Sequence, residues 1–340
     1  MDKNIKTILL VLGAIVLVSA LALGIFMATQ AASWRSMQEA YKTTGGIAQE
    51  YTEEWTFDYS DGTELRLEMI AVDVEIIESE TAAGCSAVFK GTRRANLAGS
   101  LPYIRTGLSN GKLRFEEEYP RARGDLFGMF NVGATLRGTL TITVPKTRLS
   151  KLNASLVSGD ISATGVPAED TVLETTSGAI RVDAITGRSL QANTVSGAIA
   201  MADIVLADIM ELESVSGSIQ AEGIGARTVK VSTVSGRITL LETETDAVRA
   251  SMTSGTCKLQ LIAPADVNID AVSGAIDIEM PQDAAFRFEV ETLSGRIDIG
   301  YSMDIDNKES NRELSGRVGG GGQHEITANT VSGNISISPR

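Results

Sequence analysis

The sequence predicts an all-β fold in which residues 151–340 form a regular parallel β-solenoid of about ten rungs, each 19–21 residues long. A Ser-Gly dipeptide recurs there at nearly constant spacing, and aliphatic residues occupy the same positions after each repeat. A period of this size is typical of solenoid proteins, in which each repeat packs only on its neighbours. A third observation, an uncharged apolar run near the N-terminus, predicts a transmembrane helix ahead of the β-rich body.

The first expected element is a transmembrane helix over residues 7–28, TILLVLGAIVLVSALALGIFMA. The run carries no charge and is about long enough to cross a bilayer. Lys3 and Lys6 precede it, so residues 1–6 are expected in the cytoplasm and the rest of the chain outside. The protein is thus expected to be a single-pass protein of the cell membrane, with the lipid bilayer as a partner. A cleaved signal peptide is the alternative, although its apolar region is usually only about 7–15 residues long.

Residues 29–50 are expected to form a polar stalk, and residues 51–150 a β-rich N-terminal part of the solenoid or a cap on it. Apolar and polar residues alternate over 65–69 and 72–76, as in a half-buried strand. Further strands are expected at 87–90, 112–116 and 139–144. The loop over residues 121–131, between the last two of these strands, holds Phe127 and Phe130, which are candidates for contact with lipid or a partner. The alternative is that this loop packs over the end of the core.

The repeat itself begins at residue 158, and its intervals are 19, 19, 20, 19, 19, 19, 21, 21 and 17 residues. In each unit two short β-type runs flank the Ser-Gly step, and a variable segment returns the chain to the next unit. Glycine at this step permits a bend or a close approach of neighbouring backbones. The serines are Ser158, Ser177, Ser196, Ser216, Ser235, Ser254, Ser273, Ser294, Ser315 and Ser332.

Columns of residues support stacked rungs. The third residue after each serine is almost always isoleucine, the fifth is mostly aliphatic, and the residue between them is mostly polar, which is the periodicity of a strand. Cys257 occupies an isoleucine position and is expected to be a small buried hydrophobe, with a redox or ligand role as the alternative. Threonine is frequent two residues before the serine and valine one residue before it. Both cannot face inward on a straight strand, so a bend is expected there.

The ends of a solenoid need modification, because open strand edges recruit other chains. The N-terminal strands are expected to cap one end. The other end stops at Arg340 without an obvious cap, so end-to-end self-association or a covering partner is expected there.

Composition excludes several classes of function. Residues 151–340 hold 14 Lys and Arg against 26 Asp and Glu, whereas the first 150 residues hold 16 against 17. This acidic half repels phosphates, so nucleic acid is not an expected partner. The single histidine nearly removes histidine-based triads and multi-histidine metal sites, and the two cysteines form no CxxC pair for zinc. No phosphate-binding loop, nucleophile elbow or HExxH motif is present. No catalytic, cofactor-binding or metal-binding residue is therefore assigned, and no cofactor is expected.

Two charge patterns suggest sites. Asp277 and Asp298 share an outward column and are expected on adjacent rungs, as are Asp270 and Glu291. Paired carboxylates are what a polysaccharide hydrolase needs, although outward acidic residues also pair on any acidic solenoid.

Arg296 and Arg317 each follow Ser-Gly directly. They are expected to stack into a basic stripe that binds an anionic polymer or an acidic partner. The alternative is a solvated face whose charge is offset by neighbouring Asp and Glu.

The segment Leu-Thr-Ile-Thr-Val-Pro at 140–145, followed by repeated (Val/Thr/Leu)-Ser-Gly-x-Ile units, resembles the DUF4097 family over residues 50–340. That family is classed as candidate adhesins and includes LiaG-like proteins of the bacterial cell envelope. The resemblance implies a parallel β-solenoid at a bacterial surface and supplies no catalytic site. The expected function is a noncatalytic, adhesin-like or envelope-associated binding scaffold and not an enzyme. The alternatives are a regulatory or sensor component of an envelope-stress system, and a polysaccharide-active β-helix enzyme.

Overall fold

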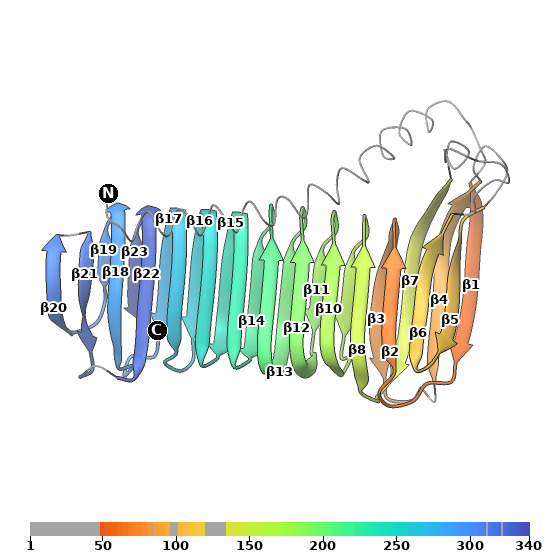
Figure 1. The fold of residues 1–340 in the computed structure, drawn as a ribbon, viewed down its shortest axis with the longest axis horizontal. Coiled ribbons are helices and arrows are strands. Elements are labelled where there is room, and N and C mark those ends of the chain that lie inside the picture. Colours follow the sequence, from red (N-terminus) through yellow and green to blue (C-terminus); the bar gives the residue numbers. More distant parts are fainter. Residues whose placement is uncertain (1–47, 83, 96–100, 120–133, 311, 321) are drawn as a thin grey trace, which may run out of the picture.

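Strands make up the whole of the regular structure that the computed structural model describes, which covers residues 48–82, 84–95, 101–119, 134–310, 312–320 and 322–340. In these residues 23 strands are hydrogen-bonded into one largely parallel sheet. The sheet coils into a long rod (Figure 1). The all-β prediction is confirmed, and the arrangement is solenoid-like. The predicted transmembrane helix 7–28 and most of the predicted stalk lie outside the described residues.

The strands fall into three groups along the chain. The first group is β1 (Gln49–Phe57), β2 (Glu64–Met69), β3 (Val72–Ser79), β4 (Cys85–Arg94), β5 (Tyr103–Ser109), β6 (Lys112–Glu118) and β7 (Thr135–Pro145). The second is β8 (Leu149–Leu156), β9 (Ile161–Thr164), β10 (Ala168–Thr175), β11 (Ile180–Asp183), β12 (Thr186–Thr194), β13 (Ile199–Ser214), β14 (Ile219–Gly225), β15 (Thr228–Glu244), β16 (Ala247–Leu261) and β17 (Asp266–Met280). The third is β18 (Phe286–Ser294), β19 (Ile297–Ile299), β20 (Met303–Ser310), β21 (Glu313–Val318), β22 (His324–Ser332) and β23 (Ile335–Pro339).

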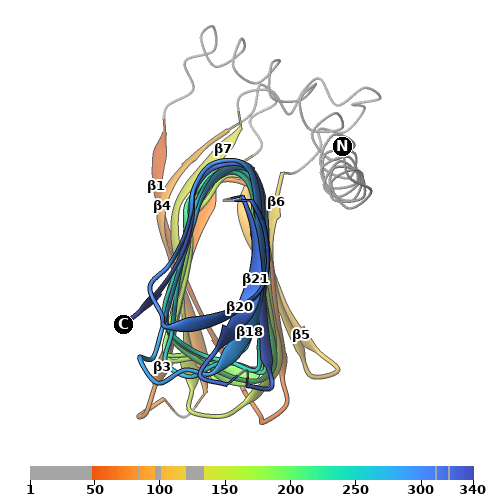
Figure 2. The ribbon, with the colours of Figure 1, turned by 90° about the vertical axis from the view of Figure 1, so that its left-hand side faces the viewer.

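Each rung contributes to two walls that enclose the core. Seen along the rod, the walls converge at a narrow arch and are joined by wider loops at the opposite side (Figure 2). The Ser-Gly steps form the arch: β15, β16 and β17 each run up one wall, through Ser-Gly and down the other. The return segments form the loops.

The predicted aliphatic columns fill the space between the walls. Ile180 lies beside Ile161 on one neighbouring rung and beside Ile199 on the other. Ile180, Ile199 and Ile238 are each at most 1% exposed. Each such side chain contributes roughly 1.5–3 kcal/mol by leaving water. The prediction that these columns face inward is confirmed.

The arch leaves no room for side chains, and this explains the glycine. A Cβ added to Gly178, Gly197 or Gly217 would lie only 1.8–1.9 Å from the carbonyl oxygen of the arch glycine on the rung before. The same clash, at 1.8–2.1 Å, recurs at Gly236, Gly255, Gly274, Gly333 and Gly295. The described arch glycines thus form one continuous column of touching backbones.

Threonines brace the arch from inside. Thr175 and Thr194 are buried, and each hydroxyl donates a hydrogen bond to the arch glycine carbonyl of the preceding rung, at 3.1 Å. Thr292 and Thr330 make the same bond to Gly333 and Gly274 at 2.9 and 3.3 Å. The residue after each of these threonines lies on the outer side: Thr176, Val195 and Val331 are half-buried, and Leu293 is exposed. The threonine column therefore faces inward and the valine column outward.

The C-terminal rung lies between two rungs that precede it in the sequence. β22 and β23 pair with β17 on one side and with β18 and β19 on the other. The serines along the arch therefore follow the order Ser273, Ser332, Ser294. The prediction that all ten Ser-Gly steps stack in sequence order is wrong. Ser315 lies instead in β21, which pairs antiparallel with β18 and β20.

At the N-terminal end, too, the order of the rungs differs from their order in the sequence. β2 and β3 lie between β8 and β9 on one side and β6 and β7 on the other, although β6 and β7 come later in the sequence. Antiparallel strands then end the parallel stack: β5 pairs with β6, β4 with β7, and β1 with β4.

A hairpin covers one wall at the C-terminal end, where the sequence shows no obvious cap. β21 and β20 extend the wall that contains β18. Tyr301 closes the core beside them: its ring packs edge-on to Phe286 with centroids 5.4 Å apart, and its hydroxyl donates to the carbonyls of Met280 and Pro281 at 2.9 and 3.0 Å.

Replacement of an arch glycine should destabilise the rod strongly. In Gly217→Ala the new methyl group would lie 1.8 Å from the Gly197 carbonyl oxygen, which is backbone and cannot move without shifting a rung. We expect a loss of about 3 kcal/mol in the free energy of unfolding, at the upper end for overpacked cores, measured by urea denaturation of the purified chain. Gly107→Ala in β5 is the matched control, since no atom lies within 4 Å of its added Cβ. Equal stability of the two variants would contradict the tight arch.

Candidate functional surface

The arch presents a long outer surface, which we call the arch ridge. In each rung it consists of four consecutive residues: the residue before the serine, the Ser-Gly step and the residue after the glycine. Across the nine arch steps that the structure describes, the charged members are Asp160, Arg237 and Arg296. At ~4.8 Å per rung the ridge is roughly 38 Å long. It therefore offers hydroxyls and small apolar groups at regular spacing along a chain of net charge −13.

Side chains link neighbouring rungs near both ends of the ridge. The Asp160 carboxylate accepts hydrogen bonds from the Ala179 amide and the Arg181 guanidinium, both at 2.9 Å. The bond from Arg181 lowers the pKa of Asp160 against the opposing effect of partial burial. Near the other end, the Asn334 side-chain oxygen accepts a hydrogen bond from the Arg296 amide at 3.0 Å. These links hold the ridge backbone in register.

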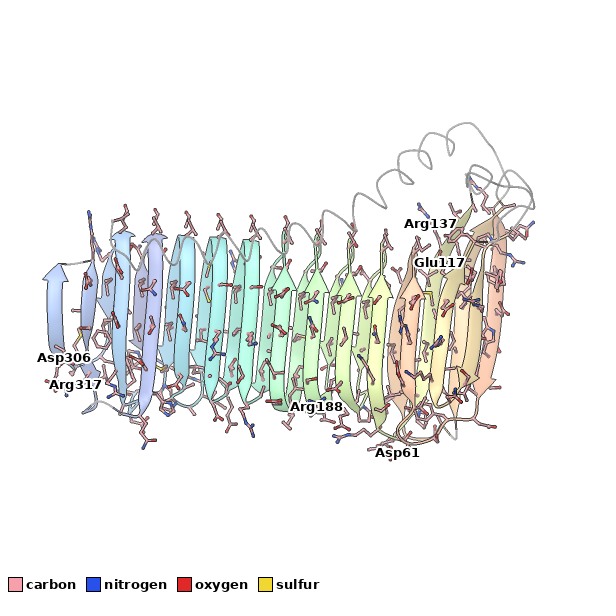
Figure 3. The ribbon with its side chains drawn as sticks, viewed as in Figure 1. Asp61, Glu117, Arg137, Arg188, Asp306 and Arg317 are labelled. Carbon is pink, nitrogen blue, oxygen red and sulfur yellow. The ribbon has the colours of Figure 1, made fainter. Side chains whose placement is uncertain are left out.

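The two predicted arginines do not form a stripe. Arg296 lies on the arch ridge, exposed, in the outermost parallel rung. Arg317 lies in β21, with Arg287 and Asp304 as its cross-strand neighbours, and its guanidinium pairs with Asp306 at 2.5 Å. Figure 3 shows this pair on the side of the rod away from the arch. The other two predicted contact residues, Phe127 and Phe130, lie outside the described residues.

The predicted carboxylate pairs are not adjacent, because the inserted C-terminal rung separates them. Ser336 lies between Asp277 and Asp298. In the other column Asn329 lies between Asp270 and Glu291 and donates a hydrogen bond to Asp270 at 3.1 Å. Each pair is thus two strand spacings apart, roughly 9.6 Å. The expectation that these carboxylates lie on adjacent rungs is therefore wrong.

Both cysteines are packed into the core. Cys257 is 1% exposed in the isoleucine column, between Ile238 and Ile276, which confirms the prediction that it is a buried hydrophobe. Burial raises the pKa of the Cys85 and Cys257 thiols to about 12. Thiols with such a pKa are unreactive near neutral pH.

Glu117 is a buried carboxylate that the sequence analysis did not single out. Its oxygens accept hydrogen bonds from the Ile70 and Ala71 amides at 2.6 and 3.0 Å and from the Tyr119 hydroxyl at 2.5 Å. On the next rung the corresponding amides bond instead to the carbonyls of residues 69 and 70. The Glu117 oxygens therefore take the place of the carbonyl acceptors that a further rung would supply at the arch. The sequence does contain a pattern that indicates this position, because the alternation that places Leu113 and Phe115 inward also places Glu117 inward.

The environment of Glu117 disfavours its charge. Desolvation by burial raises the pKa of this carboxyl, while the hydrogen bonds from Tyr119, Ala71 and Ile70 act in the opposite direction. Burial next to Glu117 also raises the pKa of Tyr119 far above its ordinary value. Glu117 and Tyr119 close the end of the core, and their hydrogen bonds are made to each other and to backbone groups of the fold.

The described residues contain no group of three or more His, Cys, Asp or Glu placed to hold a metal ion. In the same part of the chain, no helix has the length and apolar character needed to span a membrane.

Several solved structures are similar to this chain. One is a candidate lipid-binding protein from Parabacteroides distasonis ATCC 8503, 16% identical, with a TM-score of 0.45; the match covers 87% of this chain and 98% of that one. Another is a candidate adhesin from Bacteroides fragilis NCTC 9343, 11% identical, with a TM-score of 0.44, covering 85% and 97%. A candidate adhesin from Parabacteroides distasonis ATCC 8503 is 14% identical, with a TM-score of 0.38, covering 69% and 94%.

No curated protein matches the chain. A family model does match it, over residues 63–338, which span every strand of the rod except β1 and the final residue of β23. The chain therefore belongs to the Toastrack DUF4097 family.

Proposed function

We propose that this protein is a noncatalytic binding scaffold of a bacterial cell envelope, held at the membrane by residues 7–28 with its rod outside the cytoplasm. The observation that carries the proposal is the arch ridge, where four positions of similar chemistry repeat on nine described rungs. A surface that repeats along a rigid rod suits an extended partner, such as a cell-wall polymer or a strand-like protein segment. The resemblance to candidate adhesins, noted from the sequence, is compatible with this role.

The rigidity of the rod supports its proposed role as a binding scaffold. Touching arch backbones and buried aliphatic columns fix each rung against its neighbours, so a partner meets a preformed surface. Preorganisation lowers the conformational entropy that is lost on binding. The ridge is also nearly free of charge, so a partner does not have to remove strongly hydrated groups from water to reach it.

The ridge should bind through its half-buried valines and exposed serines. We expect Val215→Arg with Val234→Arg to weaken binding by about tenfold or more, since a charge placed inside the contact loses hydration without gaining a partner. Binding is measured by co-sedimentation of the full chain with purified cell-wall sacculi, and by photo-cross-linking from the Ser235 position in living cells for protein partners. Val205→Arg, at an exposed position away from the arch, is the control. Binding that survives the double substitution would contradict a role for the ridge.

Topology can be tested with the cysteines. Both native thiols are buried, so the unaltered chain should not react with a membrane-impermeant maleimide. We expect Ser273→Cys, exposed on the arch ridge, to be labelled in intact cells that express the full chain. Labelling that appears only after lysis would place the rod in the cytoplasm and contradict the proposed orientation.

A further inference from the structure

One strand edge at the C-terminal end of the rod has no partner strand in the part of the chain that the structure describes. Figure 1 shows β18, β19, β20 and β21 together at this end. β21 covers β18 on one wall, over residues 286–291. On the other wall β19 pairs with β23 and with no further described strand. We call residues 295–299, from the last arch glycine to the end of β19, the open edge.

The backbone of the open edge lacks a hydrogen bond that other rungs make. There the amide of the inward isoleucine donates to a carbonyl of the next rung, as Ile335 donates to Arg296 at 2.9 Å. The same bond is made by Ile161, Ile180, Ile199 and Ile276. The Arg296 carbonyl and the Gly300 amide both point toward β23. By strand alternation, the amide and carbonyl groups of Ile297 and Ile299 therefore point away from the rod, as on any edge strand.

The side chains at this end are also incompletely covered. Ile297 and Ile299 are half-buried, whereas Ile335 and Ile337, which occupy the same two columns on the neighbouring rung, are 0% exposed. Leu293, beside the last Ser-Gly step, is 51% exposed. The open edge thus combines free backbone groups with apolar side chains that a further strand would cover.

The charges of the open edge identify the strand that fits it. Arg296 and Asp298 are exposed on either side of Ile297, and neither forms an ion pair with another described residue. If β19 of a second copy pairs antiparallel with this edge and Ile297 lies opposite Ile297, each Arg296 lies opposite the other copy's Asp298. Opposite charges in such cross-strand positions are stabilising. A register centred on Asp298 would instead place two carboxylates opposite one another, which is destabilising.

We propose that the open edge is a self-association site, at which two copies of this chain join end to end through antiparallel pairing of β19 centred on Ile297. In this register the two Ile297 residues exchange a pair of N–H to carbonyl hydrogen bonds. The contact is twofold symmetric, so it closes as a dimer and does not grow into a fibre. It uses the end of the rod and not the arch ridge, so it goes beyond the proposed function and does not depend on it.

A disulfide trap tests the register. Ile297→Cys is placed in the full chain, which is solubilised in detergent so that no bilayer restricts the approach of two rods. Cysteine suits this column, since Cys257 already occupies it. Opposed Cα atoms in a hydrogen-bonded antiparallel pair lie about 5.5 Å apart, within the range that a disulfide allows. We expect mild oxidation to give a covalent dimer on a non-reducing gel.

Ile299→Cys is the matched control. In the proposed register the two Ile299 residues lie about 14 Å apart along the paired strands, so this variant should stay monomeric under the same oxidation. The unaltered chain should also stay monomeric, because both native thiols are buried.

Charge reversal tests the partner. In the Ile297→Cys chain, Arg296→Asp alone or Asp298→Arg alone places like charges opposite one another twice, and each should lower the initial rate of dimer formation about tenfold or more. The two reversals combined in one chain restore opposite charges and should restore the rate. Mixing the two singly reversed chains should restore it as well, since one copy then presents two acidic and the other two basic side chains.

The rescue separates a lost contact from a damaged fold, because a chain that fails to fold is not restored by a second reversal or by mixing. No dimer from Ile297→Cys, equal dimer from Ile299→Cys, or a rate that ignores the charges at Arg296 and Asp298 overturns the inference.

Discussion

The close approach of backbones at the arch is the constraint on which the rest of the rod depends. From Gly178 onward each arch glycine lies against the carbonyl of the arch glycine on the neighbouring rung, so two walls can be joined by one tight step. This contact fixes the register of every rung, because a slip of one residue would bring a serine side chain into the column. Because the rungs share one register, the inward isoleucines and threonines of each rung align with those of its neighbours.

The C-terminal end of the rod is built by leaving a rung vacant and filling it later, whereas at the N-terminal end later strands are added to both sides of the rung formed by β2 and β3. At the C-terminal end the chain passes from β17 to β18, forms the β20–β21 hairpin and returns to insert β22 and β23. The inserted rung has strands on both sides, so its backbone groups are paired. It also places Asn329 and Ser336 between acidic residues that would otherwise repel one another across a single strand spacing. At the N-terminal end Glu117 supplies the acceptors that an interrupted rung lacks.

Local pattern predicted the fold class, the two short strands that flank each Ser-Gly step, and the inward columns. The side-chain period of a strand and the need for glycine at a tight step both act within one rung. Pattern could not predict which rungs are neighbours. Ser315-Gly316 has nearly the same spacing as an arch step, and Val318 continues the aliphatic column in sequence. In the structure Val318 pairs instead with Phe286 and Met303. The run at Gly319 and Gly320, both with positive φ, was the available signal that the repeat is interrupted there.

To predict the candidate surfaces correctly, one would also have needed to know which rungs are neighbours. The arginine stripe and the carboxylate pairs were predicted by counting rungs in sequence order. The inserted rung separates the two carboxylates of each pair, whereas Arg317 lies in the antiparallel strand β21 and not at an arch step. The N-terminal end was out of reach for a different reason: Thr92 and Arg137 are 45 positions apart in the sequence, and only the antiparallel pairing of β4 with β7 brings them together. The Ser-Gly ridge needed no such pairing and could be predicted from the repeat.

Disulfide formation between arch serines tests the stacking order most directly. Neighbouring rungs place paired Cα atoms ~4.8 Å apart, within the range of about 4.4–6.8 Å that a disulfide allows, whereas alternate rungs lie roughly 9.6 Å apart. Oxidation should therefore link Ser273→Cys to Ser332→Cys and should not link Ser273→Cys to Ser294→Cys. A disulfide in the second variant and none in the first would show that the rungs follow sequence order, and would contradict the continuous arch described above.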